Sequence, residues 1–212
     1  MTILSYDNYQ CELIFMTHYN RSWVEALIIN KYKLTYEATV NQFAPNILLI
    51  TKDKKAISLV GIREAKTGEQ LYLESYLLFP IEETLSNTLN TYVSRKDIVE
   101  ISNLISLVSG GGILMMMLLC SWVNQNRLRW VVCTGTEYLR KIFDNLNIRF
   151  TELANADKTH LSVNDQKKWG TYYENNPIVI AINAKEAEMV LKKYFEEDYS
   201  RAEEKIRSLQ RG

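Results

Sequence analysis

The stretch VEISNLISLVSGGGILMMMLLCSWVNQNRLRWVVCTGT, Val99 to Thr136, decides the fold of this chain. An apolar run ends in Ser109-Gly110-Gly111-Gly112, an apolar segment of helical character follows, and a second apolar run closes with Thr134-Gly135-Thr136. This order predicts a strand, a glycine turn, a helix and a second, parallel strand. Backbone N–H groups at such a turn can hold an anion or a carbonyl, although a tight connection alone needs the same glycines.

Outward from this unit, the apolar patterns predict an α/β fold with a mixed sheet. A helix is expected over residues 21–40, followed by a hairpin of two strands at 46–51 and 56–65. A third strand is predicted from Leu71 to Leu77, and Pro80 ends it before a helix that runs to about Val93. The later expectations are strands at 98–106, 128–133, 149–153 and 177–183, with helices at 111–126, 137–145 and from 184 onward. An antiparallel front half that feeds one parallel unit excludes an alternating doubly wound sheet and a barrel.

Composition limits the classes of function. At 212 residues the chain predicts one domain over 1–184 with a polar C-terminal helix, 185–212, as an appendage. Lys and Arg total 25, as do Asp and Glu, so a general nucleic-acid binder or an electrostatic membrane binder is not expected. The longest apolar run, Ile113 to Cys120, is far shorter than the roughly 20 residues that span a bilayer.

The start of the chain and its cysteines favour a cytoplasmic location. The segment from Met1 to Asp7 lacks the basic start and the long apolar stretch of a signal peptide. Cys120 and Cys133 sit in apolar runs and, with Cys11, make an odd set that suits a reducing compartment. The two histidines and three cysteines show no metal-ligand spacing, so no metal is predicted.

Two glutamates interrupt apolar runs and are the candidate acid–base groups. Glu74 lies in LYLESYL and Glu100 in IVEISNL, and both are expected in central strands near the glycine turn. If they face a cleft, desolvation would raise their pKa toward the range of a general base. Arg63, at the end of VGIR, could pair with one of them or bind a substrate carboxylate. An exposed alternating strand and a structural salt bridge explain the same residues.

Other motifs are less specific. Trp169, Tyr172 and Tyr173 could stack on a ligand, or they could pack at the entrance of the last strand. The glycine turn is no Walker loop, because Ile113-Leu114 stand where Lys-Ser/Thr would follow. No nucleophile elbow surrounds Ser109.

Several collinear segments resemble the thermostable hemolysin family, and they cover roughly residues 20 to 183. They are KYKLTYEATV, VGIREA, LYLESYLLFPIEETLS, IVEISNLIS, WVVCTGTEYLRKIF and WGTYYENNPIVIAIN. That family is similar in fold to GNAT N-acyltransferases and acyl-homoserine-lactone synthases. The resemblance implies a GNAT-like mixed sheet, flanked by helices, whose two parallel strands splay apart before the glycine turn.

The resemblance also implies the chemistry. The chain would transfer a fatty acyl group from an acyl carrier protein or coenzyme A thioester to a small amine or amino-acid-like acceptor. The strand 99–106 would pair with the pantetheine arm, and Ser109 to Gly112 would receive its phosphate end. Leu107 stands where GNAT loops carry Gln or Arg, which favours an acyl carrier protein as donor and partner.

Roles for individual residues follow from the same resemblance. Glu100, or Glu74 through a water, would take the proton of the amine, and Arg63 would hold a carboxylate of the acceptor. Backbone N–H groups near 102–104 would polarise the thioester oxygen. The implied substrate contacts are Arg63, Ser102, Asn103, Trp169, Tyr172 and Tyr173, and the implied donor contacts are Leu104, Ser109, Gly110, Gly111, Gly112 and Thr134.

Two other functions stay open on the sequence. The family's name suggests a haemolytic, membrane-active protein, and haemolysis could also arise indirectly from an amphiphilic acylated product. A non-catalytic member that binds an acyl ligand for regulation is the third class. Lysis of erythrocytes without an acyl donor would favour the haemolytic protein. Thioester binding without turnover would favour the non-catalytic regulator.

Overall fold

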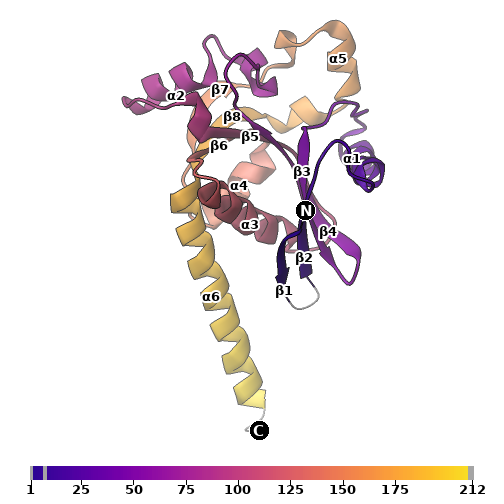
Figure 1. The fold of residues 1–212 in the computed structure, drawn as a ribbon, viewed down its shortest axis with the longest axis vertical. Helices are drawn as coiled ribbons and strands as arrows, with labels where there is room; N and C mark the ends of the chain where they lie inside the picture. Colours follow the sequence, from indigo (N-terminus) through magenta and orange to yellow (C-terminus); the bar gives the residue numbers. More distant parts are fainter. Residues whose placement is uncertain (1, 7–8, 210–212) are drawn as a thin grey trace.

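The computed structural model of the protein describes residues 2–6 and 9–209, with side chains described over 9–196. In this part of the chain, eight strands form one sheet that helices cover on both faces (Figure 1). The strands are β1 (Thr2–Tyr6), β2 (Tyr9–Ile14), β3 (Asn46–Lys52), β4 (Lys55–Glu64), β5 (Ile98–Ser106), β6 (Trp130–Gly135), β7 (Thr151–Asn155) and β8 (Ile178–Asn183). The α-helices are α1 (Arg21–Tyr36), α2 (Ile81–Leu89), α3 (Gly111–Gln125), α4 (Glu137–Asn145), α5 (Val163–Lys168) and α6 (Ala184–Leu209). Short 3-10 turns are η1 (Tyr72–Tyr76), η2 (Arg95–Asp97), η3 (Lys158–His160) and η4 (Tyr172–Asn175).

The sheet is mixed, as the sequence predicts. Its order is β1-β2-β3-β4-β5-β6-β8-β7. The pairs from β1–β2 to β4–β5 are antiparallel, and β5 and β6 form a parallel pair connected through α3. β8 then lies between β6 and β7, antiparallel to both. The predicted antiparallel front half and single parallel βαβ unit are confirmed.

The two faces of the sheet carry separate cores. On one face, Val99 and Ile101 of β5 belong to a cluster with Met115 of α3, Phe143 of α4 and Leu191 of α6. On the other face, α1 packs over β3 to β5, while η1 and α2 pack over β5, β6 and β8. Because strand side chains alternate between faces, Ile98 and Glu100 point toward this second face. The acidic side chain therefore enters a helix-covered, apolar layer.

Several elements differ from the sequence prediction. β2 was not expected, although Gln10 is exposed and Cys11 is buried in the alternation of a half-buried strand. α1 ends at Tyr36 rather than at 40, because Glu37 is left-handed (φ 57°) and its N–H bonds back to the carbonyls of Lys33 and Tyr32. α2 ends at Leu89, short of Val93, in the same way at Asn90 (φ 50°). The predicted strand from Leu71 to Leu77 is wrong, because η1 occupies this segment.

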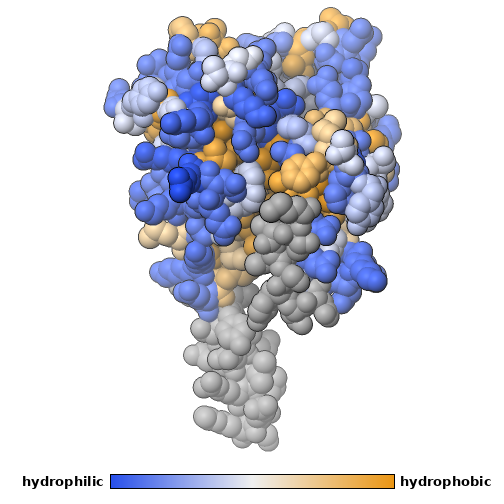
Figure 2. All heavy atoms as spheres, viewed as in Figure 1, coloured by the Kyte–Doolittle hydropathy of each residue, from blue (hydrophilic) through white to orange (hydrophobic). Residues whose placement is uncertain are grey.

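The C-terminal helix begins inside the core. Ala184, Ala187 and Leu191 of α6 are buried in the cluster that includes α3. The predicted appendage at 185–212 thus starts with packed residues, and its last positions, 210–212, lie outside the described residues. Among the residues that the structure describes, none of the helices combines the length and the hydropathy that a membrane span requires. On the face drawn in Figure 2, polar side chains surround the apolar ones.

Candidate active site

The parallel strands β5 and β6 pair over only three residues. Ile98, Val99 and Glu100 face Trp130, Val131 and Val132, and the pairing stops there. Beyond this point β5 stays paired with β4 as far as Ser106, and β6 stays paired with β8 as far as Gly135. The two strands therefore part on their way to the glycine turn, as the family resemblance implied.

A bulge in β5 sits where the strands separate. Gly61 of β4 faces Ser102 and Leu59 faces Ile105, so β5 carries one residue more than its partner over this span. Asn103 takes a positive φ of 51°, which asparagine tolerates better than most residues. An extra residue shifts the alternation of side chains, so Leu104 packs toward α3 whereas Ile105 joins the core under α1. The bulge and the positive φ of Asn103 change the direction of the backbone N–H groups at 102–104, the groups to which the family resemblance assigns the thioester oxygen.

A cavity of about 570 Å³ fills the opening between the strands. This volume lies within the range of about 300–1,000 Å³ typical of small-molecule sites. β5, β6, α1, α3 and α4 all contribute walls. Polar groups line the two ends of the cavity, one at Glu100 and the other at the glycine turn, and apolar side chains line much of the rest. The lining includes Lys31, Tyr32, Thr35, Tyr36, Tyr76, Leu104, Ser109, Gly110, Gly112, Ile113, Met116, Cys133, Thr134, Tyr138, Leu139 and Ile142.

The glycine turn forms one end of this cavity. Gly110 has a positive φ of 77° and caps α3, and the N–H groups of Gly112 and Ile113 have no acceptor among the described residues. These N–H groups stand at the positive end of a 15-residue helix. Gly111 faces the protein instead, since a Cβ there would come within 2.8 Å of Ser106 Oγ. The turn thus fits both explanations of its glycines. Gly111 is required by close packing, and Gly110 and Gly112 line the cavity where a ligand could bind.

Glu100 lies at the other end, buried and held on both oxygens. Its Oε1 accepts the N–H of Leu73 (2.8 Å), and its Oε2 accepts the N–H of Tyr72 (3.1 Å). Arg63 Nε stands 3.7 Å from Oε2. Burial raises the pKa of Glu100, although the two N–H groups and the Arg63 charge oppose that rise. A carboxylate with a raised pKa at a cavity wall can accept a proton from a bound ligand.

The first turn of η1 is what presents those N–H groups. Glu74, on the same short helix, accepts the N–H groups of Leu71 (2.7 Å) and Ile81 (2.8 Å). Arg95 Nη1 and Nη2 bond its two oxygens at 2.7 and 3.0 Å. Because the Glu74 side chain bonds the backbone of its own turn at Leu71, these bonds stabilise η1 and explain why LYLESYL does not form a strand.

Glu74 therefore lies away from both described cavities. Burial would raise the pKa of Glu74, but the bonds from Arg95, Ile81 and Leu71 outweigh burial and lower it. The prediction that Glu74 lies in a central strand beside the glycine turn is wrong. Its carboxylate braces η1, which in turn holds Glu100.

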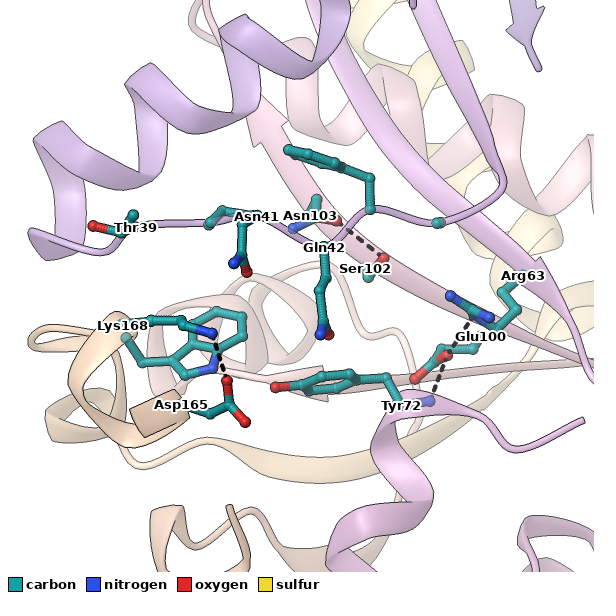
Figure 3. Close-up of a pocket in the computed structure, with 14 residues that line it drawn as sticks. Thr39, Asn41, Gln42, Arg63, Tyr72, Glu100, Ser102, Asn103, Asp165 and Lys168 are labelled. Carbon is teal, nitrogen blue, oxygen red and sulfur yellow. Dashed lines mark hydrogen bonds and ion pairs between the residues drawn. The ribbon is translucent and has the colours of Figure 1, made fainter. Parts of the chain in front are cut away.

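A second, smaller cavity of about 80 Å³ adjoins the first (Figure 3). Tyr72, Glu100, Ser102, Asn103 and Trp169 line both spaces. Arg63 lines the smaller one, as do residues 39–44 from the segment between α1 and β3, with Asp165 and Lys168 of α5. Glu100 consequently stands at the junction of a large and a small compartment.

The predicted aromatic residues divide between these roles. Trp169 borders both cavities and contacts Tyr32 and Tyr72, with ring centroids 6.2 Å apart in each case. Tyr172 is buried beneath the larger cavity. Tyr173 lines neither cavity, and its hydroxyl bonds that of Tyr76 at 2.6 Å. Packing and cavity lining are thus both present in this segment.

Most of the other predicted residues come together here. Arg63, Ser102, Asn103, Leu104, Ser109, Gly110, Gly112 and Thr134 line one or both cavities, whereas Glu74, Gly111 and Tyr173 do not. Residues that the sequence prediction missed are Tyr32, Tyr36, Asn41, Gln42, Tyr76, Asp165 and Lys168. KYKLTYEATV, with its tyrosines at positions 32 and 36, carried a signal for the first two. Asn41 and Gln42 follow no periodic pattern.

The other chemistry-bearing groups lie apart. Among the described side chains, no three His, Cys, Asp or Glu residues form a group that could hold a metal ion. Burial raises the pKa of the Cys133 thiol, which borders the larger cavity, to about 12, and the Glu100 charge adds to this. The thiol therefore stays protonated at neutral pH and is a poor nucleophile.

The family model described as "Thermostable hemolysin" matches residues 15–188. The chain belongs to the thermostable hemolysin family. This match confirms the resemblance seen in the sequence and covers both cavities. No curated protein matches the sequence.

Solved structures show the same fold at low identity. The AHL synthase LasI has a TM-score of 0.58 at 11% identity, covering 88% of this chain and 95% of that chain. FeeM, an N-acyl amino acid synthase from uncultured soil microbes, has a TM-score of 0.59 at 10% identity, and the match covers 84% of this chain and 92% of that chain. BjaI, a CoA-dependent acyl-homoserine lactone synthase solved with SAM and isopentyl-CoA, has a TM-score of 0.56 at 13% identity, and the match covers 88% of this chain and 89% of that chain. The GNAT-like fold expected from the sequence is confirmed.

Proposed function

We propose that the protein is an N-acyltransferase that moves an acyl group from a pantetheine thioester to a small amine. The observation that carries this proposal is the position of Glu100 between two joined cavities of very different size. A large compartment suits a long donor, a small one suits a compact acceptor, and a buried carboxylate stands where the two would meet. The neighbours named as acyl-homoserine lactone and N-acyl amino acid synthases share this fold and support the class of reaction.

The donor would lie between β5 and β6. The arm would follow β5 beyond Glu100, with its phosphate at the N–H groups of the glycine turn and its acyl carbons among the apolar lining. Lys31 is the one cation among the described residues of this lining. The single phosphodiester of an acyl carrier protein needs fewer cations than the three phosphates of coenzyme A. We therefore favour an acyl carrier protein as donor and partner.

The chemistry requires one proton acceptor and one polarised carbonyl. The amine nitrogen attacks the thioester carbon, the C–N bond forms, and the C–S bond breaks to release the thiol. Glu100 takes the proton that the neutral amine loses as the C–N bond forms, and it returns this proton to the leaving sulfur as the C–S bond breaks. Backbone N–H groups of the bulge at 102–104 stabilise the oxyanion. Arg63, beside Glu100, holds the acceptor.

The test is direct N-acylation by the purified protein. Matched acyl-carrier-protein and acyl-coenzyme A donors are offered with a panel of small amines, and products are identified by mass spectrometry with thiol release as the rate. Glu100→Gln should lower the rate by about 10²–10⁴-fold, as expected for loss of a general base. Glu64→Gln, an exposed carboxylate at the end of β4, is the matched control and should leave it unchanged.

Two outcomes would contradict the proposal. An unchanged rate in Glu100→Gln would remove Glu100 from the mechanism. Absence of any N-acylated product, with either donor and every amine, would overturn the acyltransferase function itself. Lipid extracts of cells that make the wild type or Glu100→Gln, compared by mass spectrometry, would show whether the same product forms in cells.

A further inference from the structure

The smaller cavity has a composition that selects one class of acceptor. We propose that it binds a small zwitterionic α-amino acid with a short, neutral polar side chain. This inference rests on the proposed N-acyl transfer and names its acceptor. At about 80 Å³, the cavity lies far below the range of about 300–1,000 Å³ that accommodates drug-sized ligands. A cavity of this size favours a compact acceptor over one with a nucleoside or a large aromatic side chain.

Arg63 offers a carboxylate site. Among the described residues its guanidinium donates no hydrogen bond, and its contact to Glu100 at 3.7 Å is longer than a good hydrogen bond. The side chain remains 33% exposed, and Figure 3 shows it reaching toward the cavity. A planar guanidinium with unused N–H groups matches the two oxygens of a carboxylate.

The distance between Arg63 and Glu100 then fixes where the amine stands. With the carboxylate on Arg63, the nitrogen must lie beside Glu100 to lose its proton there. Because the two side chains are only 3.7 Å apart, carboxylate and amine must sit close together on the ligand. An α-amino acid has one carbon between them. A longer ω-amino acid would carry its nitrogen past Glu100.

The remaining charges are already paired. Lys168 Nζ bonds Asp165 Oδ1 at 2.8 Å across the far wall. This pair leaves no net charge on that side, so a charged side chain on the acceptor would find no counter-ion there. The acceptor's own side chain is therefore expected to be neutral.

Two amides supply the polar recognition of that side chain. Asn41 and Gln42 are exposed, and their amides make no hydrogen bond with any described residue. Figure 3 shows both extending from the segment between α1 and β3 into the space above Tyr72. An amide offers a donor and an acceptor, which suits a hydroxyl or another amide.

The segment that carries these amides is anchored. Thr39 N–H bonds Lys168 O at 2.6 Å, and Ala44 packs against Gly61, where any Cβ would come within 2.9 Å of it. Arg21 donates to the carbonyls of Ala44 (2.7 Å) and Pro45 (3.0 Å). Anchored at both ends, the segment presents Asn41 and Gln42 from a fixed backbone.

The test compares acceptors for the full-length protein with one acyl donor. Serine and asparagine should exceed ethanolamine, β-alanine, tyrosine and S-adenosylmethionine in kcat/KM by at least about tenfold, the effect of one or two hydrogen bonds to charged groups. Arg63→Gln should remove most of the preference for serine over ethanolamine. Gln42→Leu should lower kcat/KM for serine and asparagine by about tenfold without changing KM for the donor. Gln70→Leu, at an exposed glutamine outside the cavities, is the matched control.

The outcomes separate this inference from the proposed function. Faster acylation of tyrosine, ethanolamine or S-adenosylmethionine would overturn the acceptor class while N-acyl transfer stands. Calorimetric binding of serine or asparagine, lost in Arg63→Gln but without turnover, would support the site and contradict the enzyme. If the protein neither binds nor acylates any α-amino acid, the inference is overturned, whatever other amine the protein uses.

Discussion

Replacing Arg95 by methionine should lower the free energy of unfolding by about 3 kcal/mol, the lower end for breaking a buried ion pair. The five N–H donors of its guanidinium are all used: two bond Glu74, one bonds Glu82, and two bond the carbonyls of Lys66 and Glu69. The Glu74 side chain is only 7% exposed, so without Arg95 its charge is buried with two N–H partners, those of Leu71 and Ile81. Because these two hydrogen bonds still stabilise the buried charge of Glu74, the expected loss of unfolding free energy stays below the upper end of the range for a broken buried ion pair, about 5 kcal/mol.

Urea unfolding followed by tryptophan fluorescence measures this loss. With an m-value of about 2 kcal/mol/M, the midpoint should fall by about 1.5 M at unchanged m. Arg95→Lys keeps the charge but loses the two-pronged geometry of the guanidinium, so its urea midpoint should lie between those of the wild type and Arg95→Met. Lys96→Met, the exposed neighbour, is the control and should stay within about 0.5 kcal/mol.

The pH dependence gives a second readout of the same interaction. Because the pKa of Glu74 is lowered in the folded state, the native protein binds fewer protons than the unfolded chain, and stability rises with pH through this window. The stabilisation is present above the ordinary glutamate pKa and is lost as the pH falls below it. The gap between wild type and Arg95→Met should therefore narrow in acid. A loss under about 1 kcal/mol at neutral pH, or a gap that widens in acid, would refute the reasoning.

Three other predictions concern the cavities and the turn. Since Glu100 must be charged to act as a base and burial raises its pKa, the acidic limb of the kcat/KM profile should lie at a higher pH than the ordinary pKa of a glutamate, and a limb at or below that pKa would contradict the assignment. Met116→Trp, in the apolar lining, should shift products to shorter acyl chains by mass spectrometry, and an unaltered chain-length profile would place the acyl group elsewhere. Gly111→Ala should cost about 1–3 kcal/mol in urea unfolding because its Cβ would overlap Ser106 Oγ. Gly112→Ala, with 3.7 Å to its nearest neighbour, should be neutral or stabilising, and equal effects of the two alanines would refute the packing argument.

The sequence predicts the fold best where local pattern and tertiary packing agree. The two apolar runs around the triple glycine become β5 and β6, because strands buried on both faces need continuous apolar residues. LYLESYL has the alternation of a strand, yet Glu74 bonds the N–H of Leu71, and Arg95, from a distant turn, completes the arrangement. Whether this segment forms a 3-10 turn or a strand therefore depends on Arg95, which lies 21 positions from Glu74 and is not visible in any local pattern.

The candidate site follows the same division. Glu100 and Arg63 are visible in the sequence because a charge inside an apolar strand is costly unless it has a partner or a role. Asn41 and Gln42 lie in an irregular segment where polar residues are ordinary. Their place over the small cavity depends on the anchoring of that segment to α5, whose own sequence shows little apolar periodicity. Residues positioned by loop packing thus escape prediction even when the strand residues beside them do not.

The pairing of β5 and β6 limits the chemistry of the proposed donor. Past Glu100 and Val132, β5 and β6 each keep one paired edge and leave the other facing the cavity. Backbone N–H and C=O groups on that open edge need partners, since leaving them unpaired in an apolar interior is unfavourable. A purely hydrocarbon ligand would cover them without bonding them. A chain with amides beside the open strand edge and apolar carbons farther in would satisfy the backbone and fill the lining of Met116, Leu139 and Ile142 together. A pantetheine thioester of a fatty acid has this order of groups, whereas a free fatty acid or a lipid tail does not.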